Sequence, residues 1–277
     1  MRVKVRSLAR NRSRNVSGPE AFETYYETLF GARWPELRRA LLAPACRVAL
    51  TEGLLRPYFL DEASSAAAEA LPLVAGDRVI DFCAAPGGKS LVLARHLRQD
   101  ATLICNERSA ARRARLHRVL DRHVPEELRR RISVTAHDAT RWGLMQPTSC
   151  DKILLDVPCS SERHVMADES HLRRWSVSRS RRLAIQAFAL LASAIDALVP
   201  GGMVLYLTCA LTPAENDEVI AKAFRKRDGQ VSLCPVQLAW GEATAYGVHV
   251  LPDAAQGRGP LYVCLLQKQM HAQRLPD

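Results

Sequence analysis

The sequence predicts an α/β domain in which a mostly parallel sheet is flanked by helices, with a short helical N-terminal extension. From position 78 onward, short β-prone segments alternate with segments of helical periodicity, which is typical of a parallel sheet. A tight turn at Pro86-Gly87-Gly88 joins the first strand to the first helix. The apolar run at 261–266 predicts a further buried strand. We therefore expect one catalytic-type domain at 73–270.

The expected elements of this domain follow from the alternation of apolar runs with turn residues. Strands are predicted at Arg78–Cys83, Thr102–Asn106, Ile132–Ala136, Lys152–Asp156 and Met203–Thr208. Helices are predicted at Lys89–Leu97, Ala110–His123, Arg179–Leu198 and Pro213–Arg225. The segment from Val231 to Lys268 is rich in strand-forming residues.

The segment at 19–72 is predicted to be a helical N-terminal extension. Apolar residues recur at helical intervals in 21–30, and Gly31 ends that helix. A second helix begins near Trp34-Pro35, where proline is favoured, and continues through Leu42. An alanine-rich helix follows Asp61.

Residues 1–18 are predicted to be a basic N-terminal arm or a transit peptide. Arg2, Arg6, Arg10 and Arg14 recur every four residues, and no acidic residue precedes Glu20. This composition is typical of a mitochondrial transit peptide, which is the reading we favour. It equally fits a basic arm that lies on RNA. Whether the mature protein begins at Met1 distinguishes the two.

Composition limits the partners and cofactors of the protein. The chain of 277 residues carries a formal net charge of +10, which favours a polyanionic partner such as nucleic acid over a merely charged surface. Its eight cysteines are scattered without a C-x-x-C pair, so we expect reduced thiols and no metal site. No apolar run is long enough to span a bilayer, and we expect no membrane partner.

The stretch from Asp81 to Ser90 is read as a strand end, a glycine turn and a helix start. A doubly wound fold binds nucleotide-like cofactors at this position. The stretch lacks the first glycine of both the dinucleotide and the phosphate-loop patterns. An acidic strand end before a small-residue turn instead suits S-adenosylmethionine, which has an amino acid and a ribose but no phosphate. The alternative is an ordinary β–α turn.

Two further acids follow the next two strands. Glu107 lies about twenty positions after the turn, where an acid can accept hydrogen bonds from ribose hydroxyls. Asp138 follows the third strand and can accept a hydrogen bond from an adenine amino group. The alternatives are a helix-capping acid for Glu107 and a turn aspartate for Asp138.

Asp156, Cys159 and Cys209 follow the ends of two later strands. The carboxyl ends of parallel strands meet at one edge of a sheet, so these side chains should share one crevice. A thiolate is the nucleophile needed to add to C6 of a pyrimidine, which makes C5 reactive toward a methyl group. The alternative for Cys159 is a buried apolar thiol.

Together, Asp81–Ser90, Asp156–Ser160 and Tyr206–Glu218 resemble the Sun/Fmu-type RNA (cytosine-5) methyltransferase family. Further segments at 22–42, 138–143 and 157–164 resemble the branch of that family that acts on mitochondrial small-subunit ribosomal RNA. The resemblance implies a Rossmann-like S-adenosylmethionine-dependent methyltransferase fold and a mitochondrial location. It also implies S-adenosyl-L-methionine as cofactor, bound or lined by Cys83, Ala84, Ala85, Pro86, Gly87, Gly88, Lys89, Glu107, Arg112, Asp138 and Asp156.

The resemblance also implies a role for each catalytic residue. Cys209 would be the nucleophile that forms a covalent adduct with C6, and Cys159 would aid release of the methylated base. Asp156 would steady the cytosine ring, and Lys89 would assist both cofactor and base.

The sequence departs from the family beside the nucleophile, which leaves a second function open. Leu207 and Ala210 flank Thr208-Cys209, where members often read Ser-Thr-Cys-Ser. The alternative function is therefore a ribosome-assembly factor that keeps the fold but methylates little. A DNA cytosine methyltransferase that uses the Pro158-Cys159 pair is a third candidate, and the cysteine at 209 argues against it.

The RNA contacts are predicted from a basic cluster that follows the Cys159 loop, for which a solvated face is the alternative. The cluster consists of Arg173, Arg174, Arg179, Arg181 and Arg182. The resemblance implies ribosomal RNA in a small-subunit particle as substrate. It also implies a helical-repeat protein partner of the mitochondrial termination-factor type.

Overall fold

The computed structural model describes residues 17–270. The predicted basic arm or transit peptide at 1–18 therefore lies almost entirely outside the described residues. Among the helices at 17–270, none combines the length and the apolar character of a membrane span.

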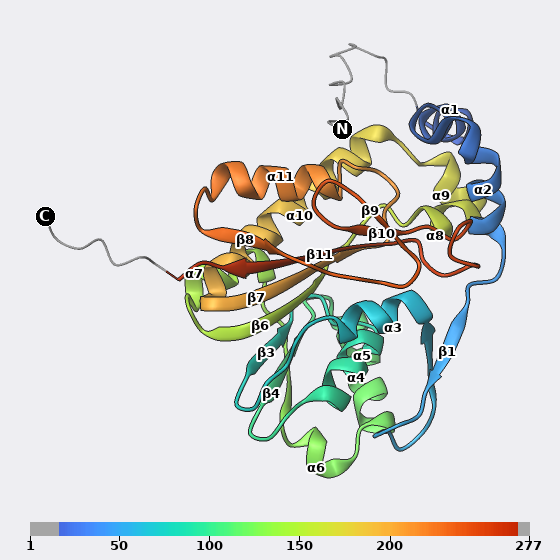
Figure 1. Cartoon of the computed structure of the whole chain (residues 1–277). Helices are drawn as coiled ribbons and strands as arrows, with labels where there is room; N and C mark the ends of the chain where they lie inside the picture. Colours follow the sequence, from blue (N-terminus) through green and yellow to red (C-terminus); the bar gives the residue numbers. More distant parts are fainter. Residues whose placement is uncertain (1–16, 271–277) are drawn as a thin grey trace, which may run out of the picture.

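A nine-stranded sheet forms the centre of the molecule (Figure 1). Eight strands follow the order β5-β4-β3-β6-β7-β11 (Leu261–Lys268)-β10 (Val248–Val250)-β9 (Gly241–Ala243), and β8 (Val231–Cys234) pairs with β11 outside this order. Its parallel part consists of β3 (Arg78–Asp81), β4 (Thr102–Asn106), β5 (Ile132–Thr135), β6 (Cys150–Asp156) and β7 (Leu198–Thr208). The five predicted strands are confirmed. β3 ends two residues earlier than predicted, because Phe82 and Cys83 already belong to the turn.

The strand-rich end of the chain completes the sheet in antiparallel fashion. β11 (Leu261–Lys268) pairs with β7, with β8 (Val231–Cys234) and with β10 (Val248–Val250). β10 in turn pairs with β9 (Gly241–Ala243). The predicted buried strand at 261–266 is thus confirmed as the first six residues of β11.

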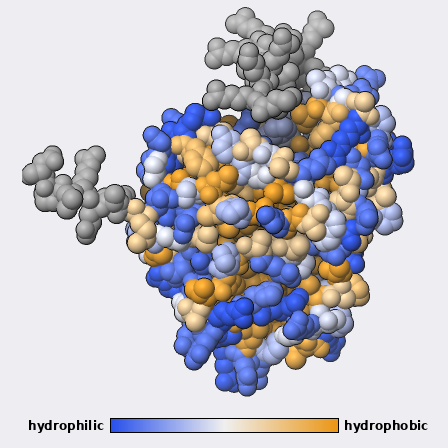
Figure 2. Space-filling view, in the orientation of Figure 1, coloured by the Kyte–Doolittle hydropathy of each residue, from blue (hydrophilic) through white to orange (hydrophobic). Residues whose placement is uncertain are grey.

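Helices cover both faces of the sheet (Figure 1). One face carries α3 (Glu62–Glu69), α4 (Gly88–His96) and α5 (Ala110–His123), with the short α6 (Glu126–Arg129) after them. The other face carries α7 (Trp142–Met145), α10 (Val177–Ala197) and α11 (Asp217–Lys226). Successive residues of β6 point to opposite faces, so Leu154 joins one apolar cluster and Ile153 and Leu155 join the other. Figure 2 shows hydrophilic side chains along the lower rim, where α6 lies.

The N-terminal helices pack directly on the segment that follows the Cys159 loop. α1 (Pro19–Phe30) and α2 (Trp34–Leu42) form a third apolar cluster with α8 (Glu162–Ala167) and α9 (Glu169–Arg173). Phe22 is fully buried there, with its ring centroid 5.3 Å from that of Trp175. The predicted helices of the extension are confirmed, and they pack against segments that follow β6 and β7.

The extension also contains a β-hairpin that the sequence prediction missed. β1 (Arg47–Leu50) pairs with β2 (Tyr58–Asp61) in a separate two-stranded sheet. Tyr58 and Leu60 face α4, and a Cβ built on Gly88 would lie 2.9 Å from Leu60 Cδ1. The hairpin therefore closes over the glycine turn of the predicted cofactor site.

Candidate active site

The turn between β3 and α4 has the backbone that its glycines predict. Gly87 caps α4 with φ of 115°, in the left-handed region that favours glycine. Asp81 is buried before the turn, and its Oδ2 accepts a hydrogen bond from Ser90 Oγ at 2.6 Å. Burial raises the pKa of Asp81 to about 7. The Asp81–Ser90 bond therefore joins the two ends of the turn.

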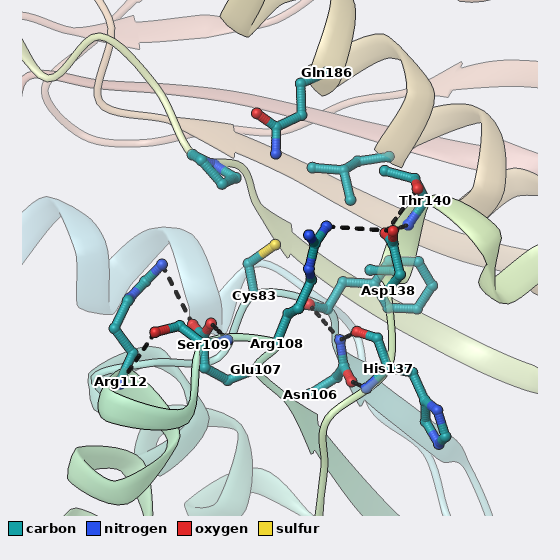
Figure 3. A pocket seen from close by; sticks show the side chains of 14 residues that line it. Cys83, Asn106, Glu107, Arg108, Ser109, Arg112, His137, Asp138, Thr140 and Gln186 are labelled. Carbon is teal, nitrogen blue, oxygen red and sulfur yellow. Dashed lines mark hydrogen bonds and ion pairs between the residues drawn. The ribbon is translucent and has the colours of Figure 1, made fainter.

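A cavity of about 530 Å³ opens beside this turn (Figure 3). It is lined by Phe82, Cys83, Asn106, Glu107, Arg108, Ser109, Arg112, His137, Asp138, Ala139, Thr140, Pro158, Gln186 and Leu190. The ends of β3, β4 and β5 thus meet at one cavity, as predicted, and bring Cys83, Glu107, Arg112 and Asp138 together.

Glu107 combines the two roles that the sequence left open. Its Oε1 accepts a hydrogen bond from Ser109 N at 2.8 Å, at the start of α5. Its Oε2 is buried, lies 3.3 Å from Arg112 Nη1, and accepts no hydrogen bond within the described residues. This oxygen retains the capacity to accept a hydrogen bond from a hydroxyl group in the cavity.

Asp138 holds its own turn and also faces the cavity. Its Oδ1 accepts hydrogen bonds from Thr140 N at 3.1 Å and Thr140 Oγ1 at 2.7 Å, and these bonds hold the pKa of Asp138 below its ordinary value. Arg108 extends across the cavity in Figure 3, and its Nη1 lies 3.3 Å from Asp138 Oδ2. An adenine amino group would share that oxygen with Arg108.

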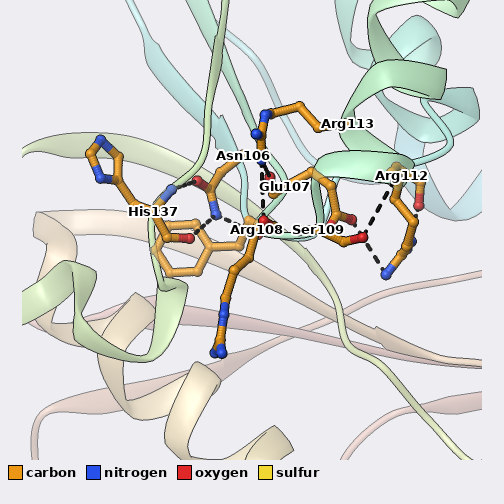
Figure 4. A network of polar contacts seen from close by, with 9 residues as sticks. Asn106, Glu107, Arg108, Ser109, Arg112, Arg113 and His137 are labelled. Carbon is orange, nitrogen blue, oxygen red and sulfur yellow. Dashed lines mark hydrogen bonds and ion pairs between the residues drawn. The ribbon is translucent and has the colours of Figure 1, made fainter.

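Asn106 fixes the floor of the cavity, and the sequence prediction missed its role. Its Nδ2 donates to the carbonyl oxygens of Phe82 and His137, both at 3.1 Å, and its Oδ1 accepts from His137 N at 2.9 Å (Figure 4). Arg112 makes a similar connection, because its Nη2 donates to Ala85 O at 2.6 Å. Only the position of Asn106 at a strand end could have indicated this function.

A smaller hollow of about 60 Å³ adjoins the turn and is lined by Lys89, Asp156 and most of the turn residues. Lys89 Nζ donates to Asp156 Oδ2 at 2.7 Å. Burial lowers the pKa of Lys89, but the Asp156 carboxylate raises it, and the net effect is an increase. Lys89 is therefore a charged donor at the predicted catalytic crevice.

The two predicted catalytic cysteines meet at the ends of β6 and β7. The Cys159 and Cys209 Sγ atoms lie 2.7 Å apart, and Cys209 N donates to Cys159 Sγ at 3.3 Å. The contact with Cys209, followed by burial, raises the pKa of the Cys159 thiol. Two residues separated by fifty positions thus form a single thiol pair beside a charged lysine.

The model of the 16S rRNA methyltransferase RsmB/F family matches residues 68–267. The chain belongs to this family.

Curated relatives agree with this membership. The 5-cytosine rRNA methyltransferase NSUN4 of Bos taurus is 34% identical over 232 residues, which cover 76% of this chain and 59% of that protein. The mitochondrial tRNA (cytosine(34)-C(5))-methyltransferase of Mus musculus is 32% identical, over 81% of this chain and 67% of its own. Ribosomal RNA small subunit methyltransferase F of Erwinia tasmaniensis is 33% identical, over 82% and 48%. The chain therefore spans about half to two thirds of the length of these relatives.

Solved structures agree with the fold. A methyltransferase homolog protein from Pyrococcus horikoshii superposes with a TM-score of 0.71 at 21% identity, over 89% of this chain and 94% of that one. NSun6 from the same organism, solved with SFG, gives a TM-score of 0.66 at 23% identity, over 77% and 54%. The predicted Rossmann-like methyltransferase fold is confirmed.

The backbone beside Cys209 is held by a hydrogen-bond network within the same loop. Leu207 and Ala210 are fully buried. Thr208 Oγ1 donates to Asn216 Oδ1 at 2.5 Å, and Asn216 Nδ2 donates to Ala210 O at 2.9 Å. The backbone around Cys209 is therefore held without hydroxyl groups at positions 207 and 210, by an asparagine that the sequence prediction missed.

The predicted RNA-binding arginines lie on the surface, outside both hollows. Arg173 and Arg174 end α9, whereas Arg179, Arg181 and Arg182 lie in the first turns of α10, and all five are exposed. Arg173 pairs with Glu169 of its own helix at 3.2 Å. Their role in RNA binding stays a prediction.

Proposed function

We propose that this protein transfers a methyl group from S-adenosylmethionine to C5 of a cytosine in RNA, with ribosomal RNA as the substrate. The observation that carries the proposal is the contact between Cys159 and Cys209, 2.7 Å apart. It lies next to the Lys89–Asp156 pair, and one wall of the 530 Å³ cavity is formed by Pro158. The similar proteins described above, among them a mitochondrial and a bacterial one, are RNA methyltransferases.

The cavity fits the proposed cofactor. Buried Glu107 Oε2 has no hydrogen-bond partner among the described residues and suits a ribose hydroxyl. Asp138 Oδ2 faces the same cavity, and the glycine turn presents backbone beside it. S-adenosylmethionine, when bound, supplies an electrophilic methyl group.

In the proposed reaction, the two thiols act in sequence on the base. Cys209 Sγ forms a bond to C6 while its proton passes to N3, and Asp156 accepts the hydrogen bond from that N–H. C5 then carries the electron density that forms the new carbon–carbon bond. Once Cys209 is bonded to C6, the Cys159 thiol releases its proton to solvent and the thiolate removes the proton from C5. The Cys209–C6 bond then breaks, and the N3 proton returns to Cys209 Sγ. Lys89 Nζ donates a hydrogen bond to Asp156 Oδ2 at 2.7 Å and so fixes the orientation of this carboxyl group at the end of β6.

The proposal extends to the setting of the reaction. We propose a mitochondrial small-subunit particle as substrate, with the five exposed arginines of 173–182 on its phosphates. A helical-repeat protein of the mitochondrial termination-factor type would select the target cytosine. Addition of such a partner should raise the rate of methyl transfer to ribosomal RNA over that of the protein alone.

A covalent trap tests the reaction. The protein is incubated with S-adenosylmethionine and ribosomal RNA that contains 5-azacytosine, and denaturation-resistant adducts are resolved by electrophoresis. We expect an adduct that Cys209→Ala abolishes, whereas Cys159→Ala accumulates the adduct with natural RNA. Cys234→Ala, a cysteine of β8 remote from the crevice, is the matched control and should behave as the wild type. Loss of the adduct in Cys159→Ala with its retention in Cys209→Ala would reverse the two roles.

A second function is favoured by one observation, the replacement of hydroxyl residues at Leu207 and Ala210. A ribosome-assembly factor would bind S-adenosylmethionine and the small-subunit particle but transfer no methyl group and form no adduct. The same assay, combined with sedimentation of the protein with the particle, separates this function from the first.

A further inference from the structure

Two buried carboxylates, Glu162 and Glu215, lie behind the cysteine pair. Their residues are 0% and 1% exposed, respectively. Within residues 17–270 neither forms an ion pair, and neither lines the two hollows of the active site. Burial of a carboxylate without a cation is unfavourable unless hydrogen bonds compensate, so the contacts of each one indicate what it does.

Glu162 connects three segments that are distant in the sequence. Its Oε1 accepts hydrogen bonds from Tyr26 of α1, with Oη at 2.5 Å, and from the hydroxyl group of Ser160. Its Oε2 accepts from Leu211 N at 3.0 Å. Ser160 directly follows Cys159, and Leu211 lies two residues after Cys209. One carboxylate thus binds both cysteine loops and the N-terminal helix.

Glu215 adds a second connection between the same loops. Its Oε2 accepts a hydrogen bond from Ser160 N at 2.8 Å, and its carbonyl oxygen accepts from Tyr206 Oη of β7 at 2.5 Å. The loop after Cys159 is therefore held from two sides, by one carboxylate on α8 and one in the loop after Cys209.

We propose that Glu162 is a positioning residue that sets the approach of Cys159 to Cys209 by fastening their two loops to each other. An effect of Glu162 on methyl transfer rests on the proposed function. Its effect on the distance between the two thiols does not. Removal of the carboxylate leaves Leu211 N, Ser160 Oγ and Tyr26 Oη without their acceptor, so the loops lose their shared contact.

The chemistry of the acceptor predicts a graded series of variants. In Glu162→Gln, the amide oxygen can serve the Leu211 N–H, and the two hydroxyl groups can rotate to accept from the amide NH₂. Glu162→Ala offers no acceptor. Tyr26→Phe removes one donor and leaves both loop contacts in place.

Disulfide formation between Cys159 and Cys209 reports how readily the two sulfur atoms meet, and the experiment needs neither RNA nor cofactor. Oxidised glutathione takes the two electrons, so that Cys159 and Cys209 lose their protons and form one S–S bond while two molecules of reduced glutathione are released. The fraction of linked peptide at a fixed glutathione ratio, measured by mass spectrometry, gives the effective concentration of one thiol at the other. The other cysteines are distinguished by their peptides.

We expect wild type and Tyr26→Phe to form the Cys159–Cys209 disulfide readily. The effective concentration in Glu162→Gln should lie within about threefold of the wild-type value. In Glu162→Ala it should fall by about tenfold or more. The matched control is Asp253→Ala, which removes another buried carboxylate whose described partner is Arg33. Circular dichroism reports whether each variant is folded. If Glu162→Ala does not fold, the Gln and Phe variants are compared with Asp253→Ala.

The outcomes separate the inference from the proposed function. A wild-type level of disulfide in a folded Glu162→Ala overturns the inference. If Glu162→Ala does not fold, the inference is overturned by a folded Glu162→Gln variant whose effective concentration falls tenfold or more below that of Asp253→Ala, because its amide keeps the loop contacts. A tenfold loss together with wild-type protein that transfers no methyl group supports it and overturns the proposed function instead. Where methyl transfer is present, Glu162→Ala should lower kcat and leave the KM for RNA unchanged.

Discussion

At the scale of single residues, burial of Glu215 makes stability depend on pH. Burial, and then repulsion from Glu162, raises the pKa of Glu215 to about 7, above its ordinary value of 4.5. The folded protein therefore binds this proton more tightly than the unfolded chain. The resulting stabilisation is fully present below about pH 4.5 and is lost as the pH rises to about 7, with an upper size of about 3 kcal/mol.

Glu215→Gln should remove this dependence, because an amide does not titrate. The measurement is the free energy of unfolding in urea at pH 5, 6, 7 and 8, and the wild type minus the variant should fall across this range. Asp81 titrates in both proteins and cancels in the difference. A difference that is constant with pH contradicts the raised pKa.

Gly87 is the residue of the turn that least tolerates a side chain. Its φ of 115° disfavours any L-residue, and an added Cβ would lie 3.0 Å from Val119 Cγ1. Gly87→Ala should lower the free energy of unfolding by about 2–3 kcal/mol and weaken S-adenosylmethionine binding. Gly229→Ala is the matched control, since its φ is 68° and nothing lies within 4 Å. Calorimetric titration with the cofactor should show weaker binding in the first variant alone.

At the scale of elements, the exposed start of α10 and end of α9 form the predicted RNA surface. Arg173→Ala combined with Arg174→Ala should weaken RNA binding and reduce the slope of log affinity against log salt by about one to two. The control is Arg130→Ala, directly after α6; like Arg173, Arg130 is exposed and paired with a glutamate one turn earlier. Filter binding at several salt concentrations measures the slope. An unchanged slope contradicts the assignment.

The elements that the sequence predicts well are those with long apolar runs. β6, β7 and β11 carry continuous buried residues, and α10 has a sustained helical period, so local pattern and final structure agree. The hairpin of β1 and β2 was missed because its strands have four residues each and take their stability from contacts with α4.

The sequence predicted those residues of the candidate site that lie near strand ends. It did not predict the residues whose role depends on tertiary contacts. Glu107, Asp138, Cys159 and Cys209 lie in the loops that follow strands, and Lys89 lies in the first turn of the helix after β3. No sequence motif around Glu162 or Asn216 indicates its role. Tyr26, which donates to Glu162, is distant in the sequence, and Thr208, which donates to Asn216, lies at the other end of the same loop. The position of a buried acid beside a proposed catalytic cysteine becomes visible only in the three-dimensional structure.

At the scale of the whole molecule, the N-terminal helices are part of one cooperative unit. Phe22 is fully buried among aromatic rings that include Tyr26, Trp34 and Trp175. Phe22→Ala should lower the free energy of unfolding by about 3–4 kcal/mol, with a single transition throughout. Phe59→Ala makes the same chemical change at a residue that is 65% exposed, and should cost less than about 0.5 kcal/mol.

Urea unfolding followed by tryptophan fluorescence and by circular dichroism tests this unity. Coincident transitions are expected, because Trp34 and Trp175 report on the third apolar cluster and the far-ultraviolet signal reports on all helices. Two separate transitions would mean that 19–72 is an independent domain. If Phe22→Ala lowered the free energy of unfolding as little as Phe59→Ala does, the packing of α1 described above would be contradicted.

The bond between Tyr26 and Glu162 has a consequence for the order in which the protein is made. Helix α1 leaves the ribosome first, yet Glu162 and Trp175, which complete its cluster, are synthesised much later. At about 5–20 residues per second, the aromatic residues of α1 wait roughly seven to thirty seconds for these partners. During that interval the nascent chain presents an unpaired aromatic surface to chaperones. The thiol pair forms later still, once Cys209 has emerged, so no shorter nascent chain holds an assembled active site.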